Sequence, residues 1–157
     1  MLNNDLSQQI KRNFPYKPTE EQENAVKSFA EFLFSPSADS VFLMKGYAGT
    51  GKTTWTSALV RTLDSLQRKV ILLAPTGRAA KVFSGYAEHP AYTIHKKIYR
   101  QKVFSNETDN FVANQNLHRN TLFIVDEASM IANEGLSGGH FGSGRLFNMY
   151  IMDWDAG

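Results

Sequence analysis

The chain has 157 residues, of which 42% are hydrophobic and 20% charged, and its formal net charge of +2 is too small to indicate nucleic-acid binding by itself. This length fits about one domain of 100–200 residues, and the composition excludes a disordered or collagen-like chain. No apolar run approaches the roughly 18 residues of a membrane-spanning helix, so we expect no membrane partner. The sequence contains no cysteine, which excludes disulfides and thiolate metal sites. This cysteine usage fits a reducing compartment, so we expect a cytoplasmic protein.

Helix and strand patterns alternate along the chain. Thr19 begins a helix that runs to about Leu33, because Gln22 completes a capping box and apolar residues recur at helical spacing. A second helix begins at about Gly51 and places Trp55 on its apolar, core-facing side. Continuous apolar runs indicate three buried strands, at residues 41–44, 70–74 and 122–125. Buried strands separated by helices predict an α/β fold with a mainly parallel sheet covered on both faces.

The remaining segments are less regular. We expect two short helices after the second strand, and residues 100–116 are polar, which leaves a hairpin or a loose insertion as alternatives. Five glycines fall within residues 135–144 and indicate a flexible loop or a phosphate-facing turn. Residues 145–154 place apolar side chains on one face, so we expect a C-terminal helix. We divide the single domain into an N-terminal extension (1–18), a core (19–134), the glycine-rich loop (135–144) and this helix (145–157).

A P-loop pattern, G-x-x-x-x-G-K-[ST], begins at Gly46. Its glycines let the backbone curl so that successive N–H groups point at phosphate oxygens, at a helix N-terminus whose dipole favours anions. Lys52 supplies a charge for the β- and γ-phosphates, and the Thr53 hydroxyl is a ligand for Mg²⁺. An apolar run precedes the loop and a helix follows it, as the motif requires. The sequence therefore predicts a site for ATP and Mg²⁺ formed by Gly46, Tyr47, Ala48, Gly49, Thr50, Gly51, Lys52 and Thr53.

Two acidic residues, Asp126 and Glu127, follow the third predicted strand. A carboxylate beside a P-loop is the expected second protein ligand of Mg²⁺, a role we assign to Asp126. Glu127 can polarise a water for attack on the γ-phosphate, so we assign it, together with Lys52, to catalysis. A base of this kind favours hydrolysis of ATP over transfer of its phosphoryl group to a metabolite. A small-molecule kinase is therefore the weaker alternative.

Two further blocks lie between the second and third strands. They are Ala-Pro-Thr-Gly-Arg-Ala-Ala-Lys-Val at residues 74–82 and Thr93-Ile-His95. Together with Thr19-Glu-Glu-Gln22, the P-loop and Val125-Asp-Glu-Ala-Ser-Met130, they resemble in order the motifs of superfamily-1 DNA helicases of the RecD type. The resemblance extends from Phe14 to about Trp154. Many families share the P-loop, whereas the two further blocks are much more particular to these helicases.

The resemblance implies a three-layer, RecA-like P-loop fold and the N-terminal lobe of a motor that couples ATP hydrolysis to movement along single-stranded DNA. It implies that Gln22 contacts the adenine edge, although the capping box competes for the same carboxamide. It also implies that Thr76 and His95 face single-stranded DNA. Lys96 lies beside them in a basic stretch that can follow a phosphate backbone, and the alternative for this stretch is an ordinary solvated helix face.

The chain departs from the family pattern at its C-terminal side. Family members continue into a sensor strand ending in Gly-Asp-x-x-Gln and into a second helicase lobe, and this sequence matches neither. We therefore expect an incomplete sheet, and a chain competent at most for nucleotide binding. A truncated gene, a piece of a longer protein and half of a complex are equally open. The alternative function is a P-loop nucleotide-binding module without turnover.

Overall fold

The computed structural model describes residues 2–34, 41–101, 111–113 and 120–131. Its centre is a sheet of three parallel strands, β1 (Lys69–Ala74), β2 (Ala91–Thr93) and β5 (Thr121–Val125), in the order β2-β1-β5. Leu72 pairs with Ala91 on one side and with Ile124 on the other, so β1 lies between the other two strands. The parallel sheet and its helices confirm the predicted α/β class and agree with a RecA-like P-loop fold.

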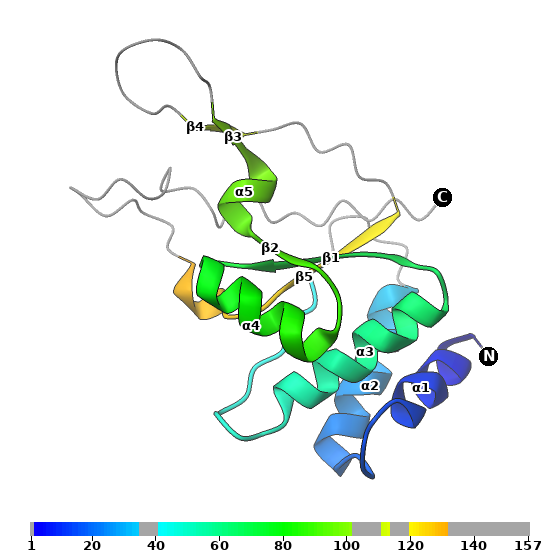
Figure 1. Cartoon of the computed structure of the whole chain (residues 1–157). Coiled ribbons are helices and arrows are strands. Elements are labelled where there is room, and N and C mark those ends of the chain that lie inside the picture. The colour runs from blue at the N-terminus through cyan, green and yellow to red at the C-terminus, as the bar shows by residue number, and fades with distance from the viewer. Residues whose placement is uncertain (1, 35–40, 102–110, 114–119, 132–157) are drawn as a thin grey trace, which may run out of the picture.

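Helices lie on both sides of this sheet (Figure 1). Below it in this view lie α1 (Leu2–Arg12), α2 (Glu20–Leu33), α3 (Lys52–Ser65) and α4 (Gly77–Ala87), and above it lies α5 (Ile94–Ile98). A short 3₁₀ turn, Ala128–Met130, follows β5. The capping box at Thr19, the end of α2 and the start of α3 fall where the sequence predicts them. None of the helices in the described ranges is long and apolar enough to cross a membrane.

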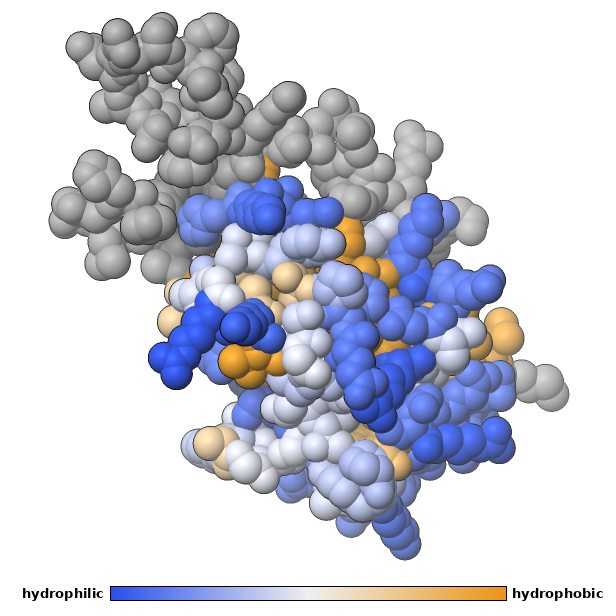
Figure 2. Space-filling view, in the orientation of Figure 1, coloured by the Kyte–Doolittle hydropathy of each residue, from blue (hydrophilic) through white to orange (hydrophobic). Residues whose placement is uncertain are grey.

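Alternating residues of β1 belong to two hydrophobic clusters, one on each face of the sheet. Val70 and Leu72 belong to a large cluster with side chains of α1–α4, including Phe83 and the predicted core residue Trp55. Ile71 and Leu73 belong to a smaller cluster with Ile94. A continuous apolar strand is expected when both faces are covered. Figure 2 shows mostly hydrophilic residues on the face turned to the viewer, with smaller hydrophobic areas between them.

The segment at residues 41–44 is not a strand, so this prediction is wrong. Val41 and Leu43 are 57% and 64% exposed, whereas Phe42 and Met44 pack against the large cluster. No other segment of the described chain pairs with these residues through a backbone ladder. The apolar run is therefore buried on one side only, and without a neighbouring strand its alternate side chains remain in solvent.

Two elements were not expected from the sequence. The helix α1 falls in the predicted N-terminal extension and buries Leu6 and Ile10 against α2 and α3. The Asn13 amide that follows it donates to the Thr62 hydroxyl of α3 over 2.8 Å. The second unexpected element is the three-residue strand β2. The hairpin alternative for the polar stretch is confirmed in part, since β3 (Tyr99–Gln101) and β4 (Phe111–Ala113) pair antiparallel. The predicted glycine-rich loop and C-terminal helix lie outside the described residues.

Candidate nucleotide-binding site

The P-loop connects the irregular segment at residues 41–45 to α3. Gly49 and Gly51 have φ values of +80° and +82°, a left-handed conformation that L side chains rarely adopt. Gly51 is the N-cap of α3, and Lys52 is its first helical residue. The loop therefore meets a helix N-terminus, where N–H groups are left without helical acceptors and the dipole favours an anion.

The spacing of the glycines creates a backbone cradle. A Cβ atom on Gly46 would lie 2.8 Å from Thr50 Oγ1, and a Cβ on Gly51 would collide with the Gln22 amide nitrogen. The Thr50 hydroxyl donates to the Tyr47 carbonyl oxygen over 2.8 Å and closes the turn. Side chains at the two glycine positions would thus displace groups that hold the loop. This close packing fits a loop whose backbone approaches phosphate.

Lys52 is in the first turn of α3, and its side chain extends back across the P-loop. Its ammonium group donates to the Gly46 carbonyl oxygen and, over 2.8 Å, to that of Tyr47. Both partners are exposed carbonyls, so the ammonium can exchange them for phosphate oxygens without leaving a buried charge unpaired. Thr53, also in the first turn, is exposed on the same helix N-terminus. These positions fit an ATP phosphate chain.

Gln22 is buried at the base of the loop. Its Oε1 accepts from the Thr19 backbone N–H over 3.0 Å, and its Nε2 donates to the Thr50 carbonyl oxygen over 3.3 Å. The carboxamide thus completes the capping box and ties α2 to the P-loop. Each of these polar atoms makes one tertiary or capping contact, and the carboxamide still has a second lone pair and a second N–H group that could meet adenine. The adenine role of Gln22 stays a prediction.

The acidic pair lies directly after β5. The Asp126 N–H donates to the Leu73 carbonyl oxygen and extends the β1–β5 ladder by one residue. Asp126 Oδ1 accepts from the Glu127 N–H over 2.9 Å. Glu127 is exposed and adopts the left-handed conformation, with φ of +55°. Such backbone strain in a non-glycine residue is uncommon and clusters at functional sites.

A tyrosine that the sequence analysis missed holds Asp126. The Tyr86 hydroxyl of α4 donates to Asp126 Oδ2 over 2.7 Å, and the Tyr86 carbonyl oxygen accepts from the Ser57 hydroxyl of α3. Burial raises the pKa of the Tyr86 phenol well above its usual range, and the hydrogen bond and the negative charges of Asp126 and Glu127 add to this effect. Tyr86 therefore stays neutral and links the P-loop helix to the carboxylate.

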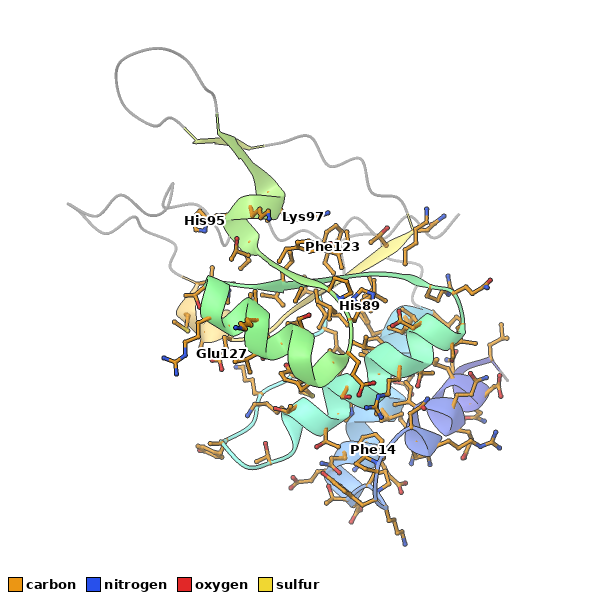
Figure 3. The ribbon with its side chains drawn as sticks, viewed as in Figure 1. Phe14, His89, His95, Lys97, Phe123 and Glu127 are labelled. Atoms are coloured by element: carbon orange, nitrogen blue, oxygen red, sulfur yellow. The ribbon has the colours of Figure 1, made fainter. Side chains whose placement is uncertain are left out.

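Three of the five sequence blocks emerge at one edge of the sheet. The carboxyl end of β1 leads to Thr76, and that of β5 leads to Asp126. Because Ala74 pairs with Thr93, the carboxyl end of β2 leads to His95 and Lys96 at the same edge. In open α/β sheets ligands bind at this edge. Figure 3 shows Glu127 at the end of the sheet that lies on the same side of the view as the P-loop.

The three predicted DNA-contacting residues have local structural roles as well. The Thr76 hydroxyl oxygen accepts from the Ala79 N–H and caps α4, and Thr76 itself is exposed. His95 is half-buried on the short helix α5, and Lys96 is exposed beside it. The Lys96 backbone N–H donates to the Thr93 hydroxyl. Of these three residues, Thr76 and Lys96 are exposed, and their hydroxyl and ammonium groups can contact phosphate.

The predicted Mg²⁺ ligands form a sparse set. Among the described residues, no three His, Cys, Asp or Glu side chains gather as a metal cluster. Thr53 and Asp126 would offer one hydroxyl and one carboxylate. Magnesium beside a nucleotide is typically held by one or two carboxylates and by phosphate oxygens, with water at its other positions. The chemistry of this donor set fits Mg²⁺ that arrives with a nucleotide.

A glycine-built loop at a helix N-terminus, a lysine across it and a carboxylate at the adjacent sheet edge define a P-loop nucleotide-binding domain. Residues 17–137 match the family model described as an AAA domain, a family of P-loop NTPases, and the chain belongs to this family. It is 32% identical over 108 residues to the multifunctional conjugation protein TraI of Escherichia coli, which covers 64% of this chain and 6% of that protein. It is 28% identical over 149 residues to the uncharacterized protein MJ1519 of Methanocaldococcus jannaschii, which covers 85% of this chain and 12% of that protein.

Proposed function

We propose that this chain is the ATP-binding lobe of a DNA helicase of the RecD type, in which ATP hydrolysis drives movement along single-stranded DNA. The observation that carries the proposal is the common sheet edge at which Thr76, His95 and Asp126 follow three neighbouring parallel strands. This arrangement supports the proposal, because the carboxylate that we assign to Mg²⁺ and the segments that we assign to DNA follow neighbouring strands at one edge. Similarity to a conjugation protein supports a role on DNA. The chain spans only 6–12% of the length of the curated relatives described above.

Each residue of the site has one role in this proposal. The P-loop backbone and Lys52 bind the phosphates, and Thr53 and Asp126 hold Mg²⁺, which supplies positive charge to the phosphate oxygens. Glu127 accepts a proton from the attacking water. Tyr86 keeps the Asp126 carboxylate oriented through its hydrogen bond. Thr76, His95 and Lys96 contact the DNA strand.

Calorimetric titration with Mg-ATP tests the nucleotide site. Lys52→Ala removes the ammonium group for the terminal phosphates, and we expect affinity to fall about tenfold or more, because hydrogen bonds to charged groups contribute about 1.5–3 kcal/mol. Lys27→Ala is the matched control, since Lys27 is an exposed lysine of α2 outside the site. Equal affinity of the parent, Lys52→Ala and Lys27→Ala would contradict the assignment.

DNA-stimulated ATPase activity separates the motor from its two alternatives. In the longest natural form of the protein, we expect single-stranded DNA to raise the ATPase rate. Glu127→Gln should keep Mg-ATP affinity but lose most turnover, because the amide cannot accept the proton of the attacking water. Absence of ATP turnover both with and without DNA in that form would favour a binding module. Phosphoryl transfer to a small molecule would favour a kinase.

A further inference from the structure

Tyr86 connects the two elements that carry the proposed Mg²⁺ ligands. Thr53 lies in the first turn of α3, and Ser57 follows it by one helical turn, so their side chains share one face of this helix. The Ser57 hydroxyl donates to the Tyr86 carbonyl oxygen over 3.0 Å. The Tyr86 hydroxyl in turn donates to Asp126 Oδ2 over 2.7 Å. One residue of α4 thus makes a contact one turn from the first ligand and a direct contact with the second.

This bridge is anchored in the packed core. Helices α3 and α4 lie side by side on one face of the sheet (Figure 1). Phe83, three residues before Tyr86 on α4, is fully buried, and the centres of the two rings are 5.2 Å apart. Tyr86 itself is half-buried. The phenol is therefore held by packing as well as by hydrogen bonds, and it cannot freely follow a displaced carboxylate.

Both oxygens of Asp126 accept hydrogen bonds from protein groups. Oδ2 accepts from Tyr86, and Oδ1 accepts from the Glu127 backbone N–H over 2.9 Å. The last torsion angle of an aspartate side chain has a broad distribution, so a carboxylate without such donors rotates readily. Donors at both oxygens restrict this rotation. Each oxygen has a second lone pair, which is left for a metal ion or for a water of its shell.

A carboxylate with a fixed orientation suits Mg²⁺ better than Ca²⁺. Mg²⁺ requires near-ideal octahedral geometry, with ligands at about 2.0–2.1 Å. Ca²⁺ accepts about six to eight ligands in flexible geometry and can take both oxygens of one carboxylate. Selectivity between the two ions depends on the number and the flexibility of the ligands. A carboxylate that can change its orientation therefore accommodates Ca²⁺ more easily, whereas a fixed one favours the smaller ion.

We propose that Tyr86 is a positioning residue that makes the nucleotide site selective for Mg²⁺ over Ca²⁺, because it fixes the Asp126 carboxylate relative to the face of α3 that carries Thr53. This inference rests on the proposed function, since it takes Thr53 and Asp126 as the metal ligands. In this role Tyr86 acts through Asp126 and touches neither the metal nor the nucleotide. Removal of a group that orients a metal ligand typically changes metal affinity about 10–100-fold, so the effect is measurable.

Calorimetric titration with adenylyl imidodiphosphate, a non-hydrolysable analogue of ATP, tests this role in the longest natural form of the protein. The titration is made with Mg²⁺, with Ca²⁺ and with EDTA. In Tyr86→Phe we expect the affinity with Mg²⁺ to fall about tenfold, the affinity with Ca²⁺ to fall less, and the affinity in EDTA to stay unchanged. Tyr92→Phe is the matched control, because it removes the same hydroxyl from a tyrosine of β2 whose ring is held by Lys97. All three affinities of this control should equal those of the parent.

Ser57→Ala tests the other contact of the bridge without changing a core ring. It should lower the preference for Mg²⁺ to a smaller extent than Tyr86→Phe, because the hydrogen bond to Asp126 remains. Equal losses with Mg²⁺, Ca²⁺ and EDTA in Tyr86→Phe would show a merely structural role and overturn the inference. An unchanged ion preference in either variant would overturn it as well. Failure of the proposed function gives a different result, since the parent itself would then bind the analogue equally well with Mg²⁺ and with EDTA.

Discussion

Replacing Tyr86 by phenylalanine removes one oxygen from the link between α4 and the acidic pair. The ring remains, with its centre 5.2 Å from that of Phe83, so no cavity forms in the core. The loss is the 2.7 Å hydrogen bond to Asp126, of a type that contributes about 1.5–3 kcal/mol. Asp126 is half-buried, and water can partly replace the phenol on Oδ2. We therefore expect the free energy of unfolding to fall by about 1.5 kcal/mol, the lower end of this range.

Urea denaturation followed by circular dichroism measures this loss, and the slope with urea should not change. Tyr47→Phe is the control, because it also removes one phenol hydroxyl, and Tyr47 is 89% exposed. A loss for Tyr86→Phe no larger than that of the control would refute the role of the hydrogen bond. The pH dependence gives a second readout. Because the folded-state pKa of Tyr86 is raised, its contribution to stability is complete below the ordinary pKa of about 10 and is lost as the pH rises above that value, and Tyr86→Phe lacks this loss.

Two further predictions concern the P-loop and the segment before it. Gly51→Ala should lower the free energy of unfolding by about 1–2 kcal/mol and weaken Mg-ATP binding, since φ is +82° and the added Cβ collides with a buried amide. In Gly85→Ala of α4 the added Cβ meets open space, so the free energy of unfolding should instead rise by about 0.5–1 kcal/mol. A similar loss of stability in both variants, measured by urea denaturation, would contradict the reasoning. Phe42→Ala should cost at least about 2 kcal/mol, because the ring stacks on the core tryptophan, whereas exposed Leu43→Ala should cost less than about 0.5 kcal/mol. Equal thermal stability of these last two variants would show that the segment is not buried on one side.

Local patterns in the sequence predict much of the fold. The capping box at Thr19 and the helix after Gly51 depend on neighbours within a few residues, and both are confirmed. Two of the three predicted buried strands are confirmed as well, and each has a pairing partner in the sheet. The strand predicted at residues 41–44 fails for a different reason. An apolar run shows that side chains avoid water, but strand formation also needs a pairing partner, and a partner is supplied by tertiary structure.

The missed features share this dependence on distant partners. The strand β2 has only three residues, and it is a strand because Tyr92 aligns with Leu73 of β1. Tyr86 lies 40 residues before Asp126, so no local pattern connects them. A weak signal exists, since Tyr86 follows Phe83 at helical spacing and thus lies on the buried side of α4. The helix α1 is mostly polar, and only a few inward residues such as Leu6 and Ile10 mark it.

The two ladders of the central sheet close loops of very different length, and this sets an order for their assembly. Leu72 and Ala91 are 19 residues apart, whereas Lys69 and Thr121 are 52 residues apart. Closing the longer loop costs about 0.9 kcal/mol more chain entropy, because the cost grows with the logarithm of loop length. We expect β1 and β2 to pair first, around the helix that connects them, and β5 to join later. Asp126 and Glu127 directly follow β5, so we expect these two carboxylates to reach the carboxyl edge of the sheet only in the last stage of folding.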